Sequence, residues 1–173
     1  MTFDEVEKHI NLSYGKRIPQ ALNEMMWCEP LATYLNKKYG THYDDVYKTE
    51  TLDKVGIDVV LSSKQVKSEL PIHIQLTHAR EYDMSPQASS KKVDLTGKPI
   101  LDAISYKCEH YLEKGIDPKK LVLIIQGVLP ESYVHELMSQ NKKKENILHM
   151  SCFDGIYYIS DKVYPLVELS IDE

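Results

Sequence analysis

Two periods run through the hydrophobic positions of the chain, one typical of helices and the other of strands. Apolar residues recur at helical spacing in four stretches: 2–10, 19–39, 100–115 and 130–140. Short runs rich in β-branched or aromatic residues predict strands at 44–51, 57–61, 71–77, 120–127, 155–160 and 163–169. The pattern therefore predicts an α/β fold in which the helical stretches 2–10 and 19–39 come first and are followed by three strands, a helix, a strand, a helix and two strands, with a central mixed sheet flanked by helices.

Proline and glycine residues set the expected boundaries of these elements. Pro30 either kinks the second helical stretch or opens a new helix at its first turn, where a missing N–H costs little. Gly40 and Gly115 are expected to end their helices. The polar stretch 78–99 has no period, and a loop of this length inside a compact domain is usually functional or mobile.

Polar side chains interrupt two of the predicted strands. Asp58 lies near the start of the second strand, and His73, Gln75 and Thr77 share one face of the third, because side chains alternate along a strand. If the two strands pair, Asp58 and Gln75 converge on one polar patch. A buried carboxylate is costly unless it is paired or bound to a metal. Together with the backbone carbonyl of Leu76, these oxygens would suit Mg²⁺.

Lys107 is a second unusual position, because it falls inside the apolar arc of the predicted helix 100–115. A lysine in such a place either extends its ammonium to solvent or directs it at a buried anion. If the helix crosses behind the sheet, the ammonium could reach the patch around Asp58.

Length and charge narrow the class of protein. A chain of 173 residues with 42% hydrophobic residues can bury one core, so we expect a single domain spanning 1–173. The formal net charge of -5 argues against a protein that coats nucleic acid. However, the stretch 63–98 has a surplus of cations and the end of the chain is acidic, and enzymes that act on DNA can confine their cations to a cleft in this way.

The apolar runs and the cysteines indicate the cellular compartment in which the protein is expected. The longest aliphatic run, 121–125, is too short to cross a bilayer, and the first residues lack an apolar signal segment. Cys28, Cys108 and Cys152 are odd in number and widely spaced, so they match neither a disulfide framework nor a zinc pattern. We therefore expect a cytoplasmic protein with reduced cysteines and no membrane contact.

The order of elements and the polar strand positions resemble the PD-(D/E)xK, or restriction-endonuclease-like, nuclease superfamily over roughly residues 19–126. The resemblance implies an αβββαβ core, here followed by a C-terminal helix and strands. It implies Mg²⁺ (or Mn²⁺) held by Glu29 on the first helix, Asp58 on the second strand and the carbonyl of Leu76, with Glu24 as the second choice of helical acid. Gln75 takes the position of the third-strand acid or glutamine.

One position departs from the family's pattern, because Thr77 stands where the third-strand lysine is expected. The resemblance implies that Lys107 on the following helix can replace that lysine. The expected function is a metal-dependent nuclease that hydrolyses phosphodiester bonds of nucleic acid, DNA rather than RNA, with Glu29, Asp58, Gln75 and Lys107 as catalytic residues.

The alternative is an inactive module of the same fold that binds nucleic acid or a protein partner, and a homodimer is left open. Each residue also has a simpler interpretation. Asp58 can cap a turn and Gln75 can be a satisfied polar core residue. Lys107 can reach solvent, and Glu29 can be a charge favoured at a helix N-terminus.

Overall fold

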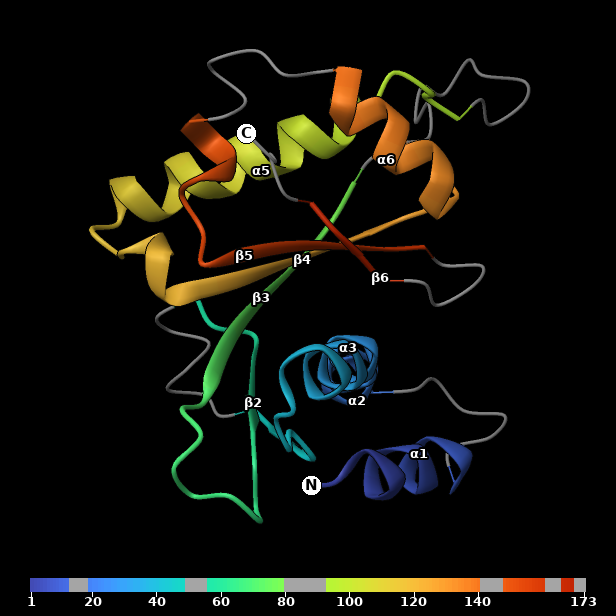
Figure 1. The fold of residues 1–173 in the computed structure, drawn as a ribbon, viewed down its shortest axis with the longest axis vertical. Helices are drawn as coiled ribbons and strands as arrows, with labels where there is room; N and C mark the ends of the chain where they lie inside the picture. The colour runs from blue at the N-terminus through green and yellow to red at the C-terminus, as the bar shows by residue number, and fades with distance from the viewer. Residues whose placement is uncertain (13–18, 49–55, 80–92, 141–147, 161–165, 170–173) are drawn as a thin grey trace. The chain divides into compact units, whose positions relative to one another are not determined.

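The computed structural model describes residues 1–12, 19–48, 56–79, 93–140, 148–160 and 166–169 (Figure 1). The predicted mixed α/β class is confirmed, with six strands in the order β1–β2–β3–β4–β5–β6. The chain divides into two compact units, Met1–Gln75 and Leu76–Glu173, and the boundary falls within β3. The restriction-endonuclease-like core and the single domain 1–173 stay predictions. No helix in the described part of the chain is long and apolar enough to cross a membrane.

The described part of the first unit contains three helices, and a proline and a glycine mark the two ends of the third. The helices are α1 (Phe3–Leu12), α2 (Gln20–Met26) and α3 (Glu29–Tyr39). Pro30 is the second residue of α3, so it opens a new helix and does not kink a continuous one. Gly40 follows α3 with a φ of 67°, the left-handed conformation that glycine adopts without steric cost, and so ends the helix as predicted.

The strands of the first unit form antiparallel pairs. They are β1 (Asp45–Tyr47), β2 (Val59–Ser62) and the first residues of β3 (Ile72–His78). Val59 pairs with Ile74 across β2 and β3, and both side chains are fully buried. The predicted strands at 57–61 and 71–77 are therefore confirmed, and the predicted strand at 44–51 is reduced to β1, with residues 49–51 outside the described residues.

The second unit packs two helices against a parallel strand pair. Its elements are α5 (Lys98–Glu113), the 3₁₀ turn η1 (Pro118–Lys120), β4 (Leu121–Gly127), α6 (Glu131–Gln140), β5 (Gly155–Ser160) and β6 (Leu166–Glu168). β4 and β5 are parallel, whereas β5 and β6 are antiparallel. Helices α5 and α6 lie on one side of β4 and β5 (Figure 1). Most of the predicted loop, residues 80–92, lies outside the described residues, and α5 begins at Lys98.

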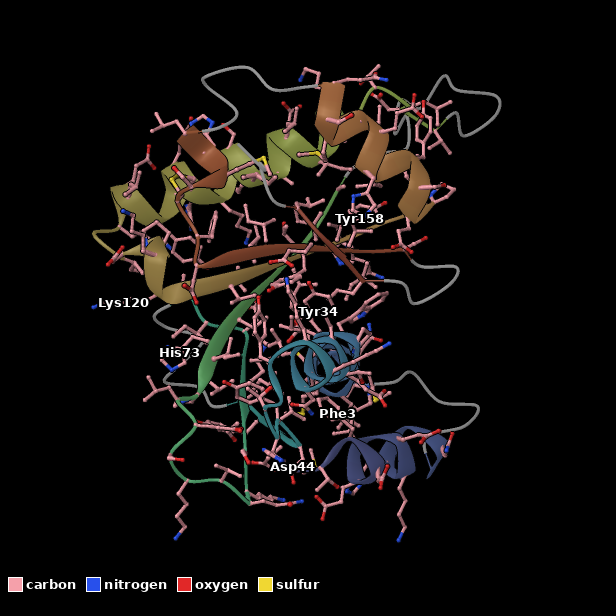
Figure 2. The ribbon with its side chains drawn as sticks, in the orientation of Figure 1. Phe3, Tyr34, Asp44, His73, Lys120 and Tyr158 are labelled. Carbon is pink, nitrogen blue, oxygen red and sulfur yellow. A yellow bond between two sulfur atoms is a disulfide. The ribbon has the colours of Figure 1, made fainter. Side chains whose placement is uncertain are left out.

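A buried tyrosine ties β5 to the turn that precedes α6. Tyr158, labelled on β5 in Figure 2, is fully buried, and its hydroxyl accepts a hydrogen bond of 2.8 Å from the backbone N–H of Leu129. A buried hydroxyl without a partner would be costly, so this bond lets a large aromatic ring fill the core of the second unit.

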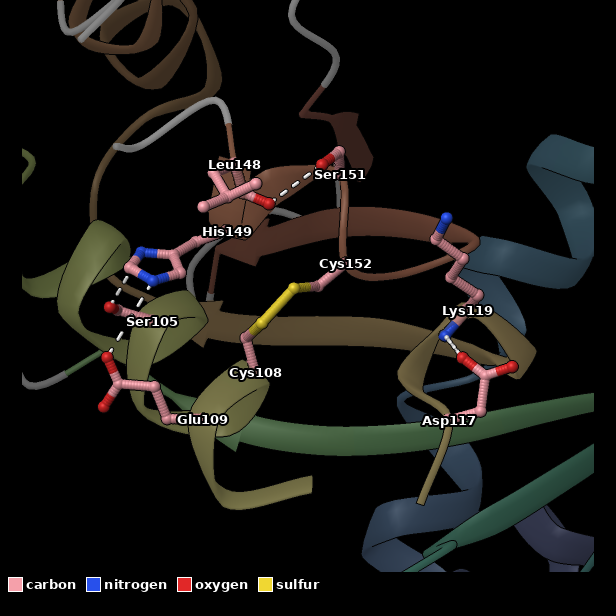
Figure 3. The surroundings of a disulfide bond; sticks show 9 residues. All are labelled: Ser105, Cys108, Glu109, Asp117, Lys119, Leu148, His149, Ser151 and Cys152. Atoms are coloured by element: carbon pink, nitrogen blue, oxygen red, sulfur yellow. Dashed lines mark hydrogen bonds and ion pairs between the residues drawn. A yellow bond between two sulfur atoms is a disulfide. The ribbon is translucent and has the colours of Figure 1, made fainter. Parts of the chain in front are cut away.

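A disulfide corrects the expectation of reduced, unpaired cysteines. Cys108 on the buried face of α5 is bonded to Cys152, which lies just before β5 (Figure 3). The two residues are 44 positions apart, and their spacing alone carries no signal that the fold brings them together. Disulfides persist mainly in oxidising compartments. A cytoplasmic location stays a prediction.

Candidate functional site

A carboxylate and an amide meet across the pair of strands β2 and β3, as the strand pattern predicts. The backbone N–H of Asp58 donates to the carbonyl of Ile74 at 3.0 Å, which extends the antiparallel pairing by one residue. This register places Asp58 opposite Gln75, and the amide nitrogen of Gln75 donates a hydrogen bond to Oδ2 of Asp58. Gln75 is only 5% exposed, so its amide orients this carboxylate from within the core.

The acidic residue that α2 contributes is Glu24. One of its carboxylate oxygens, Oε2, pairs with the ammonium of Lys48 at 2.6 Å, and the other, Oε1, accepts from the amide of Gln20 at 2.6 Å. Lys48 follows β1 directly. The side chains of Glu24 and Lys48 are 15% and 18% exposed, so this ion pair is largely removed from water.

The thiol of Cys28 links these two pairs of residues. Cys28 lies between α2 and α3, is fully buried and is not part of the disulfide. Its thiol contacts the backbone carbonyl of Glu24 at 3.6 Å. Burial raises the pKa of this thiol, and the negative charges of Asp58 and Glu24 raise it further. Both carboxylates are therefore close enough to influence the ionisation of the same thiol. We call Glu24, Cys28, Lys48, Asp58 and Gln75 the Cys28 cluster.

Glu29, the first choice of helical acid, lies in different surroundings. It is exposed at the start of α3. Its pKa is raised by partial desolvation and then by the charges of Glu7 and Asp4, which belong to α1. Of the two helical acids that the resemblance offers, Glu24 is thus the one whose charge, with that of Asp58, raises the pKa of the Cys28 thiol. A catalytic role of Glu29 stays a prediction.

The remaining expected site residues belong to the second unit. Leu76 and Thr77 are half-buried on β3, and Lys107 is half-buried on α5, where it precedes the disulfide-bonded Cys108. The first unit ends at Gln75. The expectation that Lys107 and the carbonyl of Leu76 join Asp58 stays a prediction.

The donor atoms of the Cys28 cluster do not fit a divalent cation in this arrangement. Both carboxylate oxygens of Glu24 already accept hydrogen bonds, from Lys48 and Gln20, and Oδ2 of Asp58 accepts one from Gln75. Among the described residues, no three His, Cys, Asp or Glu side chains gather as a metal ligand set. Mg²⁺ prefers several oxygen ligands in near-octahedral geometry, so these residues would have to rearrange before they could hold it.

A hollow in the second unit was not predicted. It has a volume of about 820 Å³ and lies between the end of β3 and the first half of α5. Its walls are Leu76, Thr77, His78, Asp94, Lys98, Pro99, Asp102, Ala103 and Tyr106. The sequence carries no specific signal for it, because its lining residues come from the end of one strand, from the stretch before α5 and from α5 itself.

Comparisons of the chain with protein-family models, with curated proteins and with solved structures found no match.

Proposed function

We propose that this protein is a nuclease that hydrolyses phosphodiester bonds of nucleic acid, with DNA as the expected substrate. The observation that supports this proposal is the Gln75–Asp58 hydrogen bond, with the charges of Asp58 and Glu24 both raising the pKa of the buried Cys28 thiol. A helical acid, a strand aspartate and a third-strand glutamine are the three residue types that the nuclease resemblance implies. These residues belong to α2, to the position just before β2 and to β3.

The described side chains can perform two parts of such a reaction. Asp58, oriented by the amide of Gln75, can accept a proton from an attacking water. The ammonium of Lys48 can stabilise negative charge that develops on a phosphate oxygen, provided that it exchanges its contact with Glu24 for one with the substrate. The resemblance implies Mg²⁺ or Mn²⁺ as cofactor. The experiment below therefore tests directly whether cleavage requires either ion.

The test compares cleavage by the parent protein and by Asp58→Asn, which keeps the size of the side chain and removes its charge. Labelled single-stranded and duplex DNA and RNA are incubated with Mg²⁺, with Mn²⁺ or with EDTA. We expect the parent to cleave DNA and Asp58→Asn to lose about 100-fold or more of the rate. Asp154→Asn, at an exposed position of the second unit, is the control and should cleave as the parent does. Equal rates for Asp58→Asn and the parent would identify a contaminating nuclease and refute the proposal.

A second candidate function is an inactive module of the same fold that binds nucleic acid or a protein partner. The ion pair between Glu24 and Lys48 favours it, since a carboxylate that is already neutralised by a lysine is a poor metal ligand. The cleavage reactions described above, analysed also on native gels, separate the two functions. If the protein is an inactive module, the labelled strand stays intact under every metal condition, and its migration on a native gel is retarded when the protein binds it.

A further inference from the structure

The hollow beside α5 combines an aromatic wall with hydrogen-bonding groups. Tyr106 is 63% exposed and forms part of the wall. The ring of His110 stacks on that of Tyr106, with centroids 5.8 Å apart and an angle of 15° between the planes. One face of the tyrosine ring is thus supported by the imidazole from the next turn of α5. A supported, exposed ring is a suitable platform for a second flat ring.

Asp94 supplies an oriented acceptor to the same hollow. Its Oδ1 atom accepts hydrogen bonds from the backbone N–H of Thr96 at 2.8 Å and from the hydroxyl of Thr96 at 2.6 Å. These bonds hold the carboxylate in one orientation and lower its pKa, so it is charged at neutral pH. Because both bonds use Oδ1, the Oδ2 atom can accept a hydrogen bond from a ligand.

The charges in the wall disfavour a phosphate as the bound group. Lys98 is already paired with Asp102 at 2.5 Å, and Asp94 adds a further negative charge. The first N–H groups of α5 are also occupied, since that of Lys98 donates to the hydroxyl of Thr96 and that of Ile100 to the carbonyl of Gly97. The hollow therefore fits a flat, uncharged group that carries N–H donors.

We propose that this hollow binds one unpaired nucleobase of a single strand, which stacks on Tyr106 and donates an N–H hydrogen bond to Asp94. The volume of about 820 Å³ lies within the range of small-molecule pockets, roughly 300–1,000 Å³. Cytosine, adenine and guanine carry an exocyclic amino group with two N–H donors for a carboxylate, whereas unpaired thymine offers only its single ring N3–H. The proposal rests on nucleic acid as the ligand of the protein, as in the proposed function, but it requires no cleavage.

The experiment measures binding of fluorescein-labelled oligo-dC and oligo-dT by fluorescence anisotropy in EDTA, so that hydrolysis by a metal-dependent activity does not interfere. We expect oligo-dC to bind more tightly than oligo-dT. Tyr106→Ala should weaken oligo-dC binding about tenfold, as expected for the loss of one stacked base. Tyr106→Phe keeps the ring and should bind as the parent does. Tyr39→Ala, which removes a tyrosine that is 59% exposed on α3, is the matched control and should also bind normally.

Two further measurements make the inference falsifiable. Asp94→Ala should reduce the preference for oligo-dC over oligo-dT, and replacing the cytosines with abasic sites should abolish the difference between the parent and Tyr106→Ala. Failure of the parent to bind either strand, or equal binding by the parent and Tyr106→Ala, would refute the base-binding pocket. Neither result depends on cleavage, so a parent that binds as expected but never cleaves would refute only the nuclease proposal.

Discussion

At the scale of single residues, the Cys28 cluster contains a short ion pair between Glu24 and Lys48. The two charged atoms are 2.6 Å apart and both side chains are less than one-fifth exposed. Removal of one partner from a buried pair leaves an uncompensated charge, which costs more than the pair itself contributes. The pair is therefore a sensitive point for the stability of the first unit.

Lys48→Met tests this point, because methionine keeps most of the apolar side chain and removes the ammonium. We expect the free energy of unfolding to fall by about 3 kcal/mol. The double variant Glu24→Gln with Lys48→Met should regain most of this loss, because no unpaired charge remains. Urea unfolding measures the effect, with Lys64→Met as the control, since Lys64 is half exposed and pairs with Asp45. An equal loss of unfolding free energy in the single and double variants would show that altered packing, and not an unpaired charge, causes the destabilisation.

The residue scale also shows how far the sequence predicts the site. Side-chain alternation predicts that Asp58 and Gln75 meet. Successive side chains of a strand point to opposite faces of the sheet, so the pairing of the two strands determines which side chains share a face. The helical acid is harder to predict. The stretch 19–39 reads as one helical pattern, but α2 ends at Met26 and α3 begins at Glu29, so the faces of the two helices are independent. Lys48 was missed, because nothing in the sequence around β1 marks it as the partner of Glu24.

At the scale of elements, the start of α5 depends on a glycine. Gly97 precedes α5 with a φ of 71°, which is the left-handed conformation. A Cβ atom at this position would lie 3.2 Å from two side-chain carbons of Leu137, a residue of α6. Both the backbone conformation and the close packing of α6 therefore require glycine where α5 begins.

We predict that Gly97→Ala lowers the free energy of unfolding by about 2 kcal/mol, of which about 1 kcal/mol is the cost of a left-handed alanine. Gly115→Ala is the matched control, because Gly115 has a φ of 68° but a Cβ there meets nothing within 4 Å. This control should lose only the conformational part. Chemical denaturation of both variants measures the difference, and equal losses would show that Leu137 moves aside without cost.

The succession of elements was more predictable than their ends. Strands β2 to β5 and helices α5 and α6 fall within or close to the predicted ranges, because hydrophobic period and breaker residues are local signals. By contrast, the hollow beside α5 depends on how β3 and α5 lie in space, which no local pattern records. Its polar residues, such as His78 and Asp94, are ordinary loop and strand-end residues in the sequence.

At the scale of the whole molecule, the disulfide is the covalent link that the sequence did not predict. It joins α5 to the residues before β5, so that η1, β4 and α6 lie within the closed loop. Figure 3 shows His149 beside this link, where its Nδ1 atom lies 2.9 Å from the hydroxyl of Ser105. Closure of a loop whose ends are 44 positions apart reduces the conformational entropy of the unfolded chain, which corresponds to about 4 kcal/mol of stabilisation.

The double variant Cys108→Ala with Cys152→Ala should therefore unfold with a free energy about 3–4 kcal/mol lower than that of the parent. Dithiothreitol should destabilise the parent by a similar amount and leave the double variant unchanged. Cys28→Ala is the control for loss of a buried sulfur, and its response to dithiothreitol should match that of the parent. Thiol titration of the denatured, unreduced parent should find a single free thiol. Three free thiols in protein purified without reductant, with no effect of dithiothreitol on unfolding, would contradict the disulfide. That result would instead favour the reducing compartment that the cysteine spacing predicts.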